Sequence, residues 1–405
     1  QAQRRPAGGD AMNYEEILPE RVRTIAPSGI RRFFDLASEI EGVISLGVGE
    51  PDFSTPWHIC DAAIYSIENG KTHYTANQGL FELRREICNY HKRRFQMDYD
   101  PNDNVIVTVG GSEGIDIALR ALIDPGDEVI TMNPSYVAYT PGITLAGGVC
   151  VPVELKHEDD FKLLPEALEA AISEKTKVLL INFPSNPTGG VMSHEDYAKL
   201  VPIIRDHHLI VISDEIYAEL TYDGKFASLA QFDEIKDQVI VINGFSKAFA
   251  MTGWRMGYAC APKPLAQVMC KIHQFTMLCA PTAGQYAAIE ALKGALETGY
   301  AEIEKMRRTY DRRRRIMVDA FRKMGLDCFE PKGAFYVFPG IERTGLTSEA
   351  FCEQLLRAQK VACVPGTAFG ESGEGHIRCS YAAATDKIQE AMGRIARFVE
   401  PLIKE

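Results

Sequence analysis

The chain has 405 residues, 46% of them apolar, and a net charge of −11 from 44 basic and 55 acidic side chains. This composition is typical of a globular protein with a large core, and the length allows two or three domains. An acidic chain lacks the basic face that nucleic acid requires, and the sequence contains no run of about 18 apolar residues that would predict a membrane span.

The first eleven residues show no apolar periodicity. We therefore expect residues 1–11 to be a disordered leader, with Met12 as a native start, and leave them out of the fold.

The middle of the chain alternates β-rich runs with helical patterns. We expect strands at Val105–Val109, Glu128–Met132, Lys177–Asn182, Leu209–Ser213, Val239–Asn243 and Gly257–Cys260. Helices are expected at Ser112–Ile123, from Pro165 onward, and after Ser193, which can form a capping box with Asp196. Apolar strands that alternate with helices predict an α/β fold in which helices flank a mostly parallel central sheet.

The last hundred residues follow a different pattern, which predicts a smaller α+β domain. Helices are expected at 301–324 and 347–359, and β-like runs at Ala334–Phe338, Val361–Val364 and His376–Ser380. We expect residues 12–50 to begin this small domain, 51–293 to form the large domain, and 294–405 to complete the small one. The basic run Arg312–Arg315 is interpreted as a solvated helix face.

The ten cysteines are scattered among apolar neighbours and contain no CxxC pair. They predict free buried thiols in a reducing compartment, and hence a cytoplasmic protein. The histidines and acidic residues show no spacing typical of metal ligands, so no metal site is expected.

The strongest chemical signal is the segment Gly244–Gly257, which follows the strand that ends at Asn243. Ligands of α/β sheets bind beyond the carboxyl ends of the strands. Within the segment, the amine of Lys247 could condense with an aldehyde and the guanidinium of Arg255 could bind a phosphate. Asp214 ends another expected strand, where it could pair with a cation or cap a helix.

Five motifs occur in order along the chain. They are Gly-Glu-Pro-Asp-Phe (49–53), Ser-Asn-Pro-Thr-Gly (185–189), Ser-Lys-x-x-x-Met-Thr-Gly-Trp-Arg (246–255), Lys-Gly-Ala-Phe-Tyr (332–336) and Arg-x-Ser-Tyr (378–381). Together they resemble the class I aminotransferases, which are fold type I pyridoxal-5′-phosphate (PLP) enzymes. The chain is most similar to the branch that holds prokaryotic aspartate and aromatic aminotransferases, over nearly its whole length from about Tyr14.

The resemblance implies a role for each cofactor-binding residue. Lys247 holds PLP as a Schiff base and later moves a proton, Asp214 pairs with the pyridine N–H⁺, and Tyr217 and Asn186 donate hydrogen bonds to the phenolic oxygen. The implied phosphate ligands are Gly111, Ser112, Ser246 and Arg255, and Tyr136 stacks on the ring. The chain departs from much of the family at Gly244, where a phosphate-binding serine is often found.

The resemblance also implies how substrate is held. Arg378 binds the α-carboxylate and Gly49 closes over it, with Tyr136 and Asn186 beside the substrate. Tyr74 matches a tyrosine that reaches the phosphate in the neighbouring subunit, so a homodimer with shared sites is expected. Related enzymes predict cis peptide bonds at Asn133–Pro134 and Asn186–Pro187.

The predicted reaction moves an amino group from an L-amino acid to a 2-oxo acid such as 2-oxoglutarate. Aromatic donors and aspartate are favoured, because Tyr136 and Tyr139 could form an aromatic wall. N-acetyl-diaminopimelate and alanine aminotransferases stay open, as do a β-lyase and a decarboxylase of the same fold. A regulator that only senses the cofactor is disfavoured, since the chain has no spare length for a DNA-binding module.

Overall fold

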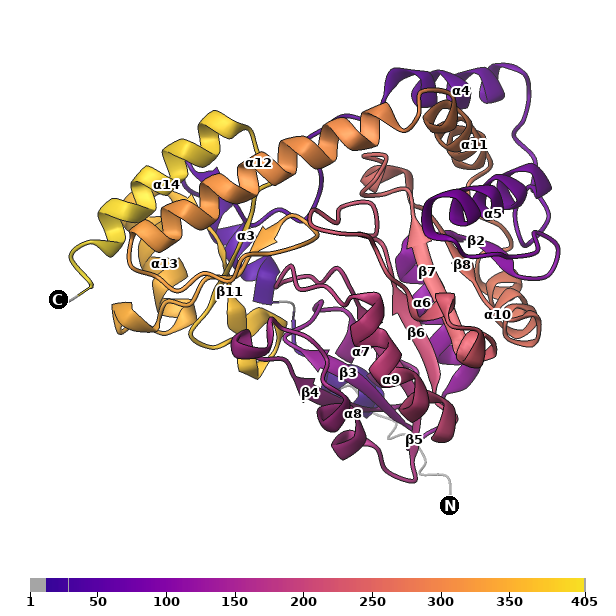
Figure 1. Ribbon diagram of the computed structural model, residues 1–405, viewed down its shortest axis with the longest axis horizontal. Helices are drawn as coiled ribbons and strands as arrows, with labels where there is room; N and C mark the ends of the chain where they lie inside the picture. The colour runs from indigo at the N-terminus through magenta and orange to yellow at the C-terminus, as the bar shows by residue number, and fades with distance from the viewer. Residues whose placement is uncertain (1–11, 28, 404–405) are drawn as a thin grey trace.

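The computed structural model describes residues 12–27 and 29–403, so the leader predicted at 1–11 lies outside the described residues. Its centre is a seven-stranded sheet in the order β2-β8-β7-β6-β5-β3-β4 (Figure 1). The strands are β2 (Val105–Val109), β3 (Glu128–Asn133), β4 (Val149–Glu154), β5 (Thr176–Asn182), β6 (Ile210–Asp214), β7 (Val239–Gly244) and β8 (Met256–Cys260). Only β8 runs against its neighbours β2 and β7, so the predicted mostly parallel sheet is confirmed.

The central strands were predictable because they are buried on both faces. Every residue of β7 and β8 is buried, because both strands lie inside the sheet and helices cover its two faces. Strand β4 was missed. It lies at the edge of the sheet, only Val153 of its six residues is buried, and Pro152 interrupts its pattern, as edge strands tolerate.

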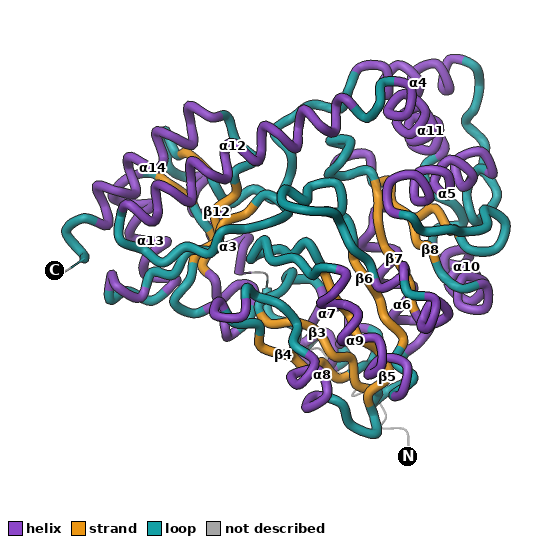
Figure 2. The backbone as a smooth tube through the Cα atoms, viewed as in Figure 1, coloured by secondary structure: helices purple, strands orange, loops and turns teal. Residues whose placement is uncertain are grey.

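Helices cover both faces of this sheet (Figure 2). They are α4 (Trp57–Glu68), α5 (Phe81–Phe95), α6 (Gly110–Leu122), α7 (Tyr139–Leu145), α8 (Pro165–Ala171), α9 (His194–Asp206), α10 (Lys263–Thr276) and α11 (Thr282–Glu297). The predicted capping box of Ser193 and Asp196 begins α9, and Pro165 occupies the first turn of α8.

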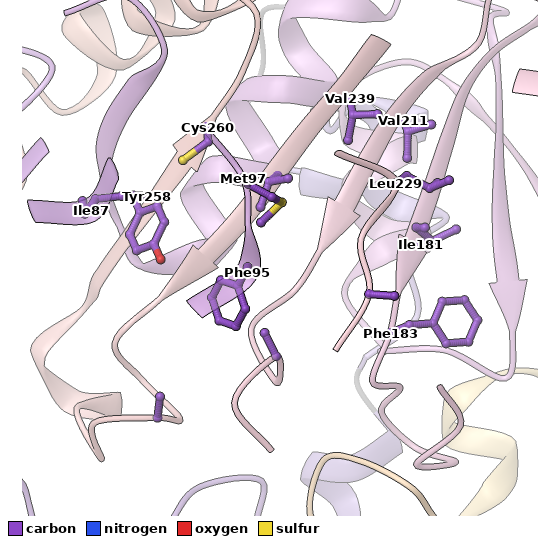
Figure 3. Packing of buried hydrophobic residues seen from close by; sticks show 14 of the residues in the cluster. Ile87, Phe95, Met97, Ile181, Phe183, Val211, Leu229, Val239, Tyr258 and Cys260 are labelled. Atoms are coloured by element: carbon purple, nitrogen blue, oxygen red, sulfur yellow. The ribbon is translucent and has the colours of Figure 1, made fainter. Parts of the chain in front are cut away.

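Each face of the sheet has its own apolar core. Side chains of α6, α7 and α10 form one core, and those of α5, α8, α9 and α11 form the other. Figure 3 shows part of the second core, where Ile87 and Phe95 of α5 lie among the strand residues Tyr258 and Cys260. Burying each such side chain contributes about 1.5–3 kcal/mol, which makes the sheet a firm base for the loops at its edge.

Helix α12 (Ala301–Lys323) leads from α11 into a second, smaller layer of helices and short strands (Figure 1). Its elements are α3 (Gly29–Ser38), β1 (Ile44–Ser45), β9 (Tyr336–Val337), α13 (Ser348–Gln359), β10 (Val361–Ala362), β11 (Val364–Pro365), β12 (Ile377–Ser380) and α14 (Thr385–Val399). Two short helices, α1 (Tyr14–Ile17) and α2 (Glu20–Arg23), precede them. Because Ile44 of β1 pairs with Val361 of β10, the N-terminal segment joins the C-terminal part, as the predicted α+β unit requires.

The interpretation of Arg312–Arg315 as a solvated face was wrong for its two central residues. Arg313 is 7% exposed and Arg314 1% exposed. Nη1 of Arg314 donates to the carbonyl oxygen of Pro331 at 2.7 Å, and its Nη2 donates to Asp311 at 2.6 Å. A helix turns about 100° per residue, so four consecutive side chains span most of its circumference and cannot all face water.

Three other predictions are confirmed. All ten cysteines are free, as predicted; six of them are buried, and Cys60, Cys150, Cys270 and Cys279 are partly exposed. The peptide bonds Asn133–Pro134 and Asn186–Pro187 are cis, and Phe183–Pro184, which was not predicted, is cis as well.

None of the helices within residues 12–27 and 29–403 is both long enough and apolar enough to cross a membrane.

Candidate active site

A cavity of about 750 Å³ opens where β5, β6 and β7 end and the β2–α6 turn begins. All the predicted site residues except Tyr74 line it: Gly49, Gly111, Ser112, Tyr136, Asn186, Asp214, Tyr217, Ser246, Lys247, Arg255 and Arg378. Parallel strands bring their carboxyl ends to one edge of a sheet, so residues far apart in the sequence meet here.

Lys247 lies in the turn that follows β7 along the chain, and its side chain is largely buried. Its Nζ donates a hydrogen bond of 2.6 Å to the carbonyl oxygen of Gly49. Burial lowers the pKa of the Lys247 amine to about 8, although the charge of Glu50 opposes this shift. About a tenth of the amine is therefore unprotonated at pH 7 and about half at pH 8. The unprotonated amine is the form that attacks a carbonyl group.

Asp214 is the last residue of β6 and is buried. Its Oδ2 accepts a hydrogen bond of 2.6 Å from the hydroxyl of Tyr139, and its Oδ1 accepts one of 3.2 Å from the backbone N–H of Ile216. Burial raises the pKa of Asp214, whereas these two hydrogen bonds and the charge of Lys247 lower it. The contact with Ile216 resembles the helix cap considered from the sequence, and it leaves the carboxylate facing the cavity.

Arg378 of β12 contributes from the smaller part of the molecule and is 3% exposed. Its Nη1 donates to Oδ1 of Asn186 at 2.8 Å, and its Nη2 donates to the carbonyl oxygen of Gly47 at 2.6 Å. Its Nε is buried and has no hydrogen-bond partner among the described residues. A buried donor without a partner is costly, so the guanidinium suits an acceptor that enters the cavity, such as a carboxylate.

The turn between β2 and α6 packs directly against Arg255. Gly110 has a φ of +70°, and a Cβ atom there would lie 2.5 Å from Nη2 of Arg255. A Cβ atom on Gly257 would lie 2.4 Å from the carbonyl carbon of Gly110, so only glycine allows this approach. The N-terminal end of α6 and the Arg255 guanidinium therefore face the cavity together, as an anion site requires.

The departure at Gly244 also has a physical reason. A Cβ atom at this position would lie 2.9 Å from the carbonyl oxygen of Met256 and 3.0 Å from Cα of Gly257. A serine would not fit without a shift of the backbone, which leaves Ser246 as the serine of this turn that lines the cavity.

Comparison with known proteins matches residues 41–395 to the family described as aminotransferase class I and II. The chain belongs to this family. It is 52% identical over 382 residues to YugH of Bacillus subtilis (strain 168), a protein that is named only provisionally as an aminotransferase. That match covers 94% of this chain and 98% of the relative. It is 44% identical to an aspartate aminotransferase of Pyrococcus abyssi, with 94% of this chain and 98% of the relative covered.

Among solved structures, an aromatic aminotransferase from Pyrococcus horikoshii OT3 superimposes with a TM-score of 0.87 at 42% identity, covering 92% of this chain and 99% of that one. Family membership makes the chain a PLP-dependent aminotransferase, as its motifs predicted.

Several side chains that line the cavity of this aminotransferase were not assigned from the sequence. The hydroxyls of Tyr336 and Tyr217 lie 2.9 Å apart, and the Arg378 guanidinium lies 4.4 Å above the Tyr336 ring. Asn182 donates from Nδ2 to the backbone oxygen of Asp214 at 3.0 Å. Two features of the sequence could have identified these residues as part of the site. Tyr336 belongs to the Lys332–Tyr336 motif, and Asn182 is the last residue of a predicted strand.

Tyr139 lines the cavity together with Tyr136. Its hydroxyl donates a hydrogen bond to Asp214, and its side chain is 2% exposed. Tyr74 lies outside the cavity, and it is 81% exposed.

Proposed function

We propose that Lys247, Asp214, Tyr217 and Asn186 hold PLP in this cavity. The Lys247 amine would hold the aldehyde group, and the Asp214 carboxylate would pair with the protonated pyridine nitrogen. Tyr217 and the amide N–H of Asn186 donate to the phenolic oxygen, and Tyr136 lies against the ring. The bound cofactor supplies an electron sink that stabilises negative charge on the substrate α-carbon.

For the phosphate we propose the backbone N–H groups of Gly111 and Ser112, the hydroxyl of Ser246 and the guanidinium of Arg255. The close packing of Gly110 on Arg255 supports this assignment, because it brings a helix N-terminus and a cation to one point.

Arg378 is the proposed ligand of the substrate α-carboxylate, and Gly49 closes over it. The unpartnered Nε of Arg378 is the observation that carries this assignment. The Lys247 amine would accept and return the proton at the substrate α-carbon. Burial supports this role, since an amine with a pKa of about 8 can both accept and donate a proton near neutral pH.

The proposed donors are aromatic amino acids or aspartate, with 2-oxoglutarate as acceptor. Apolar residues of the cavity such as Ile30, Val48 and Val137 suit an aromatic side chain.

We also propose a cytoplasmic homodimer with shared sites, and a chain divided into residues 12–50, 51–293 and 294–405. Exposed Tyr74, Phe275 and Met277 support the dimer, because large apolar side chains on a surface are typical of interfaces. They belong to one surface: Asn77 donates to the carbonyl oxygen of Leu278 at 2.8 Å, and Thr282 donates to that of His73, also at 2.8 Å.

The decisive experiment is a panel of amino donors assayed with 2-oxoglutarate. Purified enzyme should absorb visible light, and borohydride should fix the cofactor to Lys247; a label on another lysine would contradict the site. Activity with alanine or a diamine and with neither aromatic nor acidic donors would contradict the substrate proposal. Turnover without any 2-oxo acid would instead indicate a β-lyase.

A further inference from the structure

A buried hydrogen-bonded pair lies directly behind the proposed phosphate site. Nδ1 of His273, on α10, faces Oε1 of Glu113, on α6, in a short hydrogen bond. The second oxygen of Glu113 accepts the backbone N–H of Val109, the last residue of β2. His273 is 0% exposed and Glu113 7% exposed, so this carboxylate connects three elements inside the protein.

The position of Glu113 presents an electrostatic problem. It belongs to the first turn of α6, whose N-terminal N–H groups have no partner within the helix and attract anions. Gly111 and Ser112, just before it, line the cavity. A buried carboxylate at this point competes for the same donors and repels a phosphate, most strongly where water is excluded.

We propose that His273 is a positioning residue for phosphate binding, because its hydrogen bond holds the Glu113 carboxylate away from the first N–H groups of α6. With one oxygen on Val109 and the other on His273, the carboxylate leaves the first N–H groups of α6 to the phosphate. Neither side chain lines the cavity, so both act from behind the site. This inference rests on the proposed function, in which this end of α6 binds the phosphate of PLP.

A purely structural role for the pair predicts something different. If His273 only filled space between α10 and α6, its loss would weaken binding of any cofactor form, and removing the charge of Glu113 as well would add a second defect. If His273 restrains a competing anion, its loss should matter only to the phosphate group. Removing the carboxylate should then restore binding.

The test uses apoenzyme of four kinds: wild type, His273→Asn, Glu113→Gln and the double variant. Dissociation constants for PLP and for pyridoxal, which lacks the phosphate, are measured by absorbance titration, and their ratio reports the phosphate alone. His273→Asn should weaken PLP about tenfold or more, equivalent to about 1.4 kcal/mol, and pyridoxal less than about threefold. The double variant should return PLP to within about threefold of wild type.

His91→Asn is the matched control, because His91 is also fully buried but its Nε2 contacts the hydroxyl of Tyr258 instead of a carboxylate. It should leave the ratio of the two dissociation constants unchanged. If His273→Asn cannot be purified folded, the same comparison is made with His273→Gln and its double variant.

Equal weakening of PLP and pyridoxal by His273→Asn would overturn the proposal, as would unaltered PLP binding or a double variant that is not restored. Failure of wild-type apoenzyme to bind PLP while it stays folded would instead overturn the proposed function. The two failures are therefore distinguishable.

Discussion

The hydroxyl of Tyr139 lies 2.6 Å from Oδ2 of Asp214, and Tyr139 is the described side chain that donates a hydrogen bond to this oxygen. This contact opposes the effect of burial on the carboxyl group, because it lowers the pKa of Asp214, which burial raises. Tyr139 therefore helps keep Asp214 in the charged form that would pair with a pyridinium.

Tyr139→Phe should raise the lowest pH at which the enzyme is active. Without the hydroxyl, the pKa of Asp214 rises further, so the carboxylate is protonated at a higher pH and the acid limb of the kcat/KM profile moves upward. A hydrogen bond to a charged group contributes about 1.5–3 kcal/mol, so kcat/KM should fall about tenfold or more. Tyr197→Phe, which removes another deeply buried hydroxyl, is the control; an equal shift in both variants would contradict this role.

Capture of PLP by apoenzyme should depend on pH through Lys247. The amine reacts only when it is unprotonated, and burial lowers its pKa from the ordinary value of 10.5 to about 8. The rate of covalent attachment should therefore rise with pH up to about 8 and then level off. Stopped-flow absorbance with pyridoxal, which lacks a titrating phosphate, measures this directly. A rate that keeps rising toward pH 10 would show an ordinary exposed lysine, and Lys247→Ala should give no signal.

The central sheet was predictable from the sequence because its inner strands are continuously apolar and end in polar residues. β6 and β7 illustrate this, since Asp214 and the Lys247 turn each follow a buried run. Edge strand β4 and the burial of Arg313 and Arg314 were not predictable, because both depend on what packs against them. The periodicity of a segment indicates which of its own side chains are buried. It does not indicate which other element packs against them.

The candidate site was predictable where a motif carried it. Lys247, Asp214 and Arg378 all line one cavity, although they lie on different elements. Two contacts were not predictable, that of Tyr139 with Asp214 in the cavity wall and that of His273 with Glu113 behind it. They join residues 75 and 160 positions apart. No local spacing signals a pairing over such distances.

The segment between Gly47 and Thr55 is held to the active site at several points. Arg378 donates to the oxygen of Gly47, Lys247 to that of Gly49, and Thr252 to the carboxylate of Glu50. Farther along, Oδ1 of Asp52 accepts Nη1 of Arg313 at 2.9 Å, which anchors the segment to α12.

Asp52→Asn should loosen this segment over the substrate. Removing the charge opposite buried Arg313 should reduce the free energy of unfolding by about 1.5–3 kcal/mol and raise KM for the amino donor, because Gly49 is less firmly placed. PLP content should stay close to that of wild type. Asp61→Asn, on an exposed carboxylate of α4, is the control. A loss of cofactor with KM unaltered would place the effect of Asp52 elsewhere.

The dimer prediction uses two variants with different lesions. Lys247→Ala removes the covalent attachment of PLP, and Tyr74→Asp puts a negative charge where the partner's phosphate is expected. Each homodimer should be nearly inactive. In a mixed dimer with shared sites, one site carries both lesions and the other carries neither, because its lysine comes from the Tyr74 variant and its tyrosine from the Lys247 variant.

Refolding the two variants together should therefore restore activity that neither has alone. Random exchange makes about half the dimers mixed, each with one intact site of two, so about a quarter of wild-type activity should return. Subunits with different tags allow the mixed dimers to be isolated, and these should have about half of wild-type activity per dimer. The exposed position of Tyr74, outside the cavity of its own chain, is what makes this outcome expected. Mixed dimers that form and stay inactive would mean that Tyr74 does not reach the partner's site, and that each cavity works with the residues of one chain.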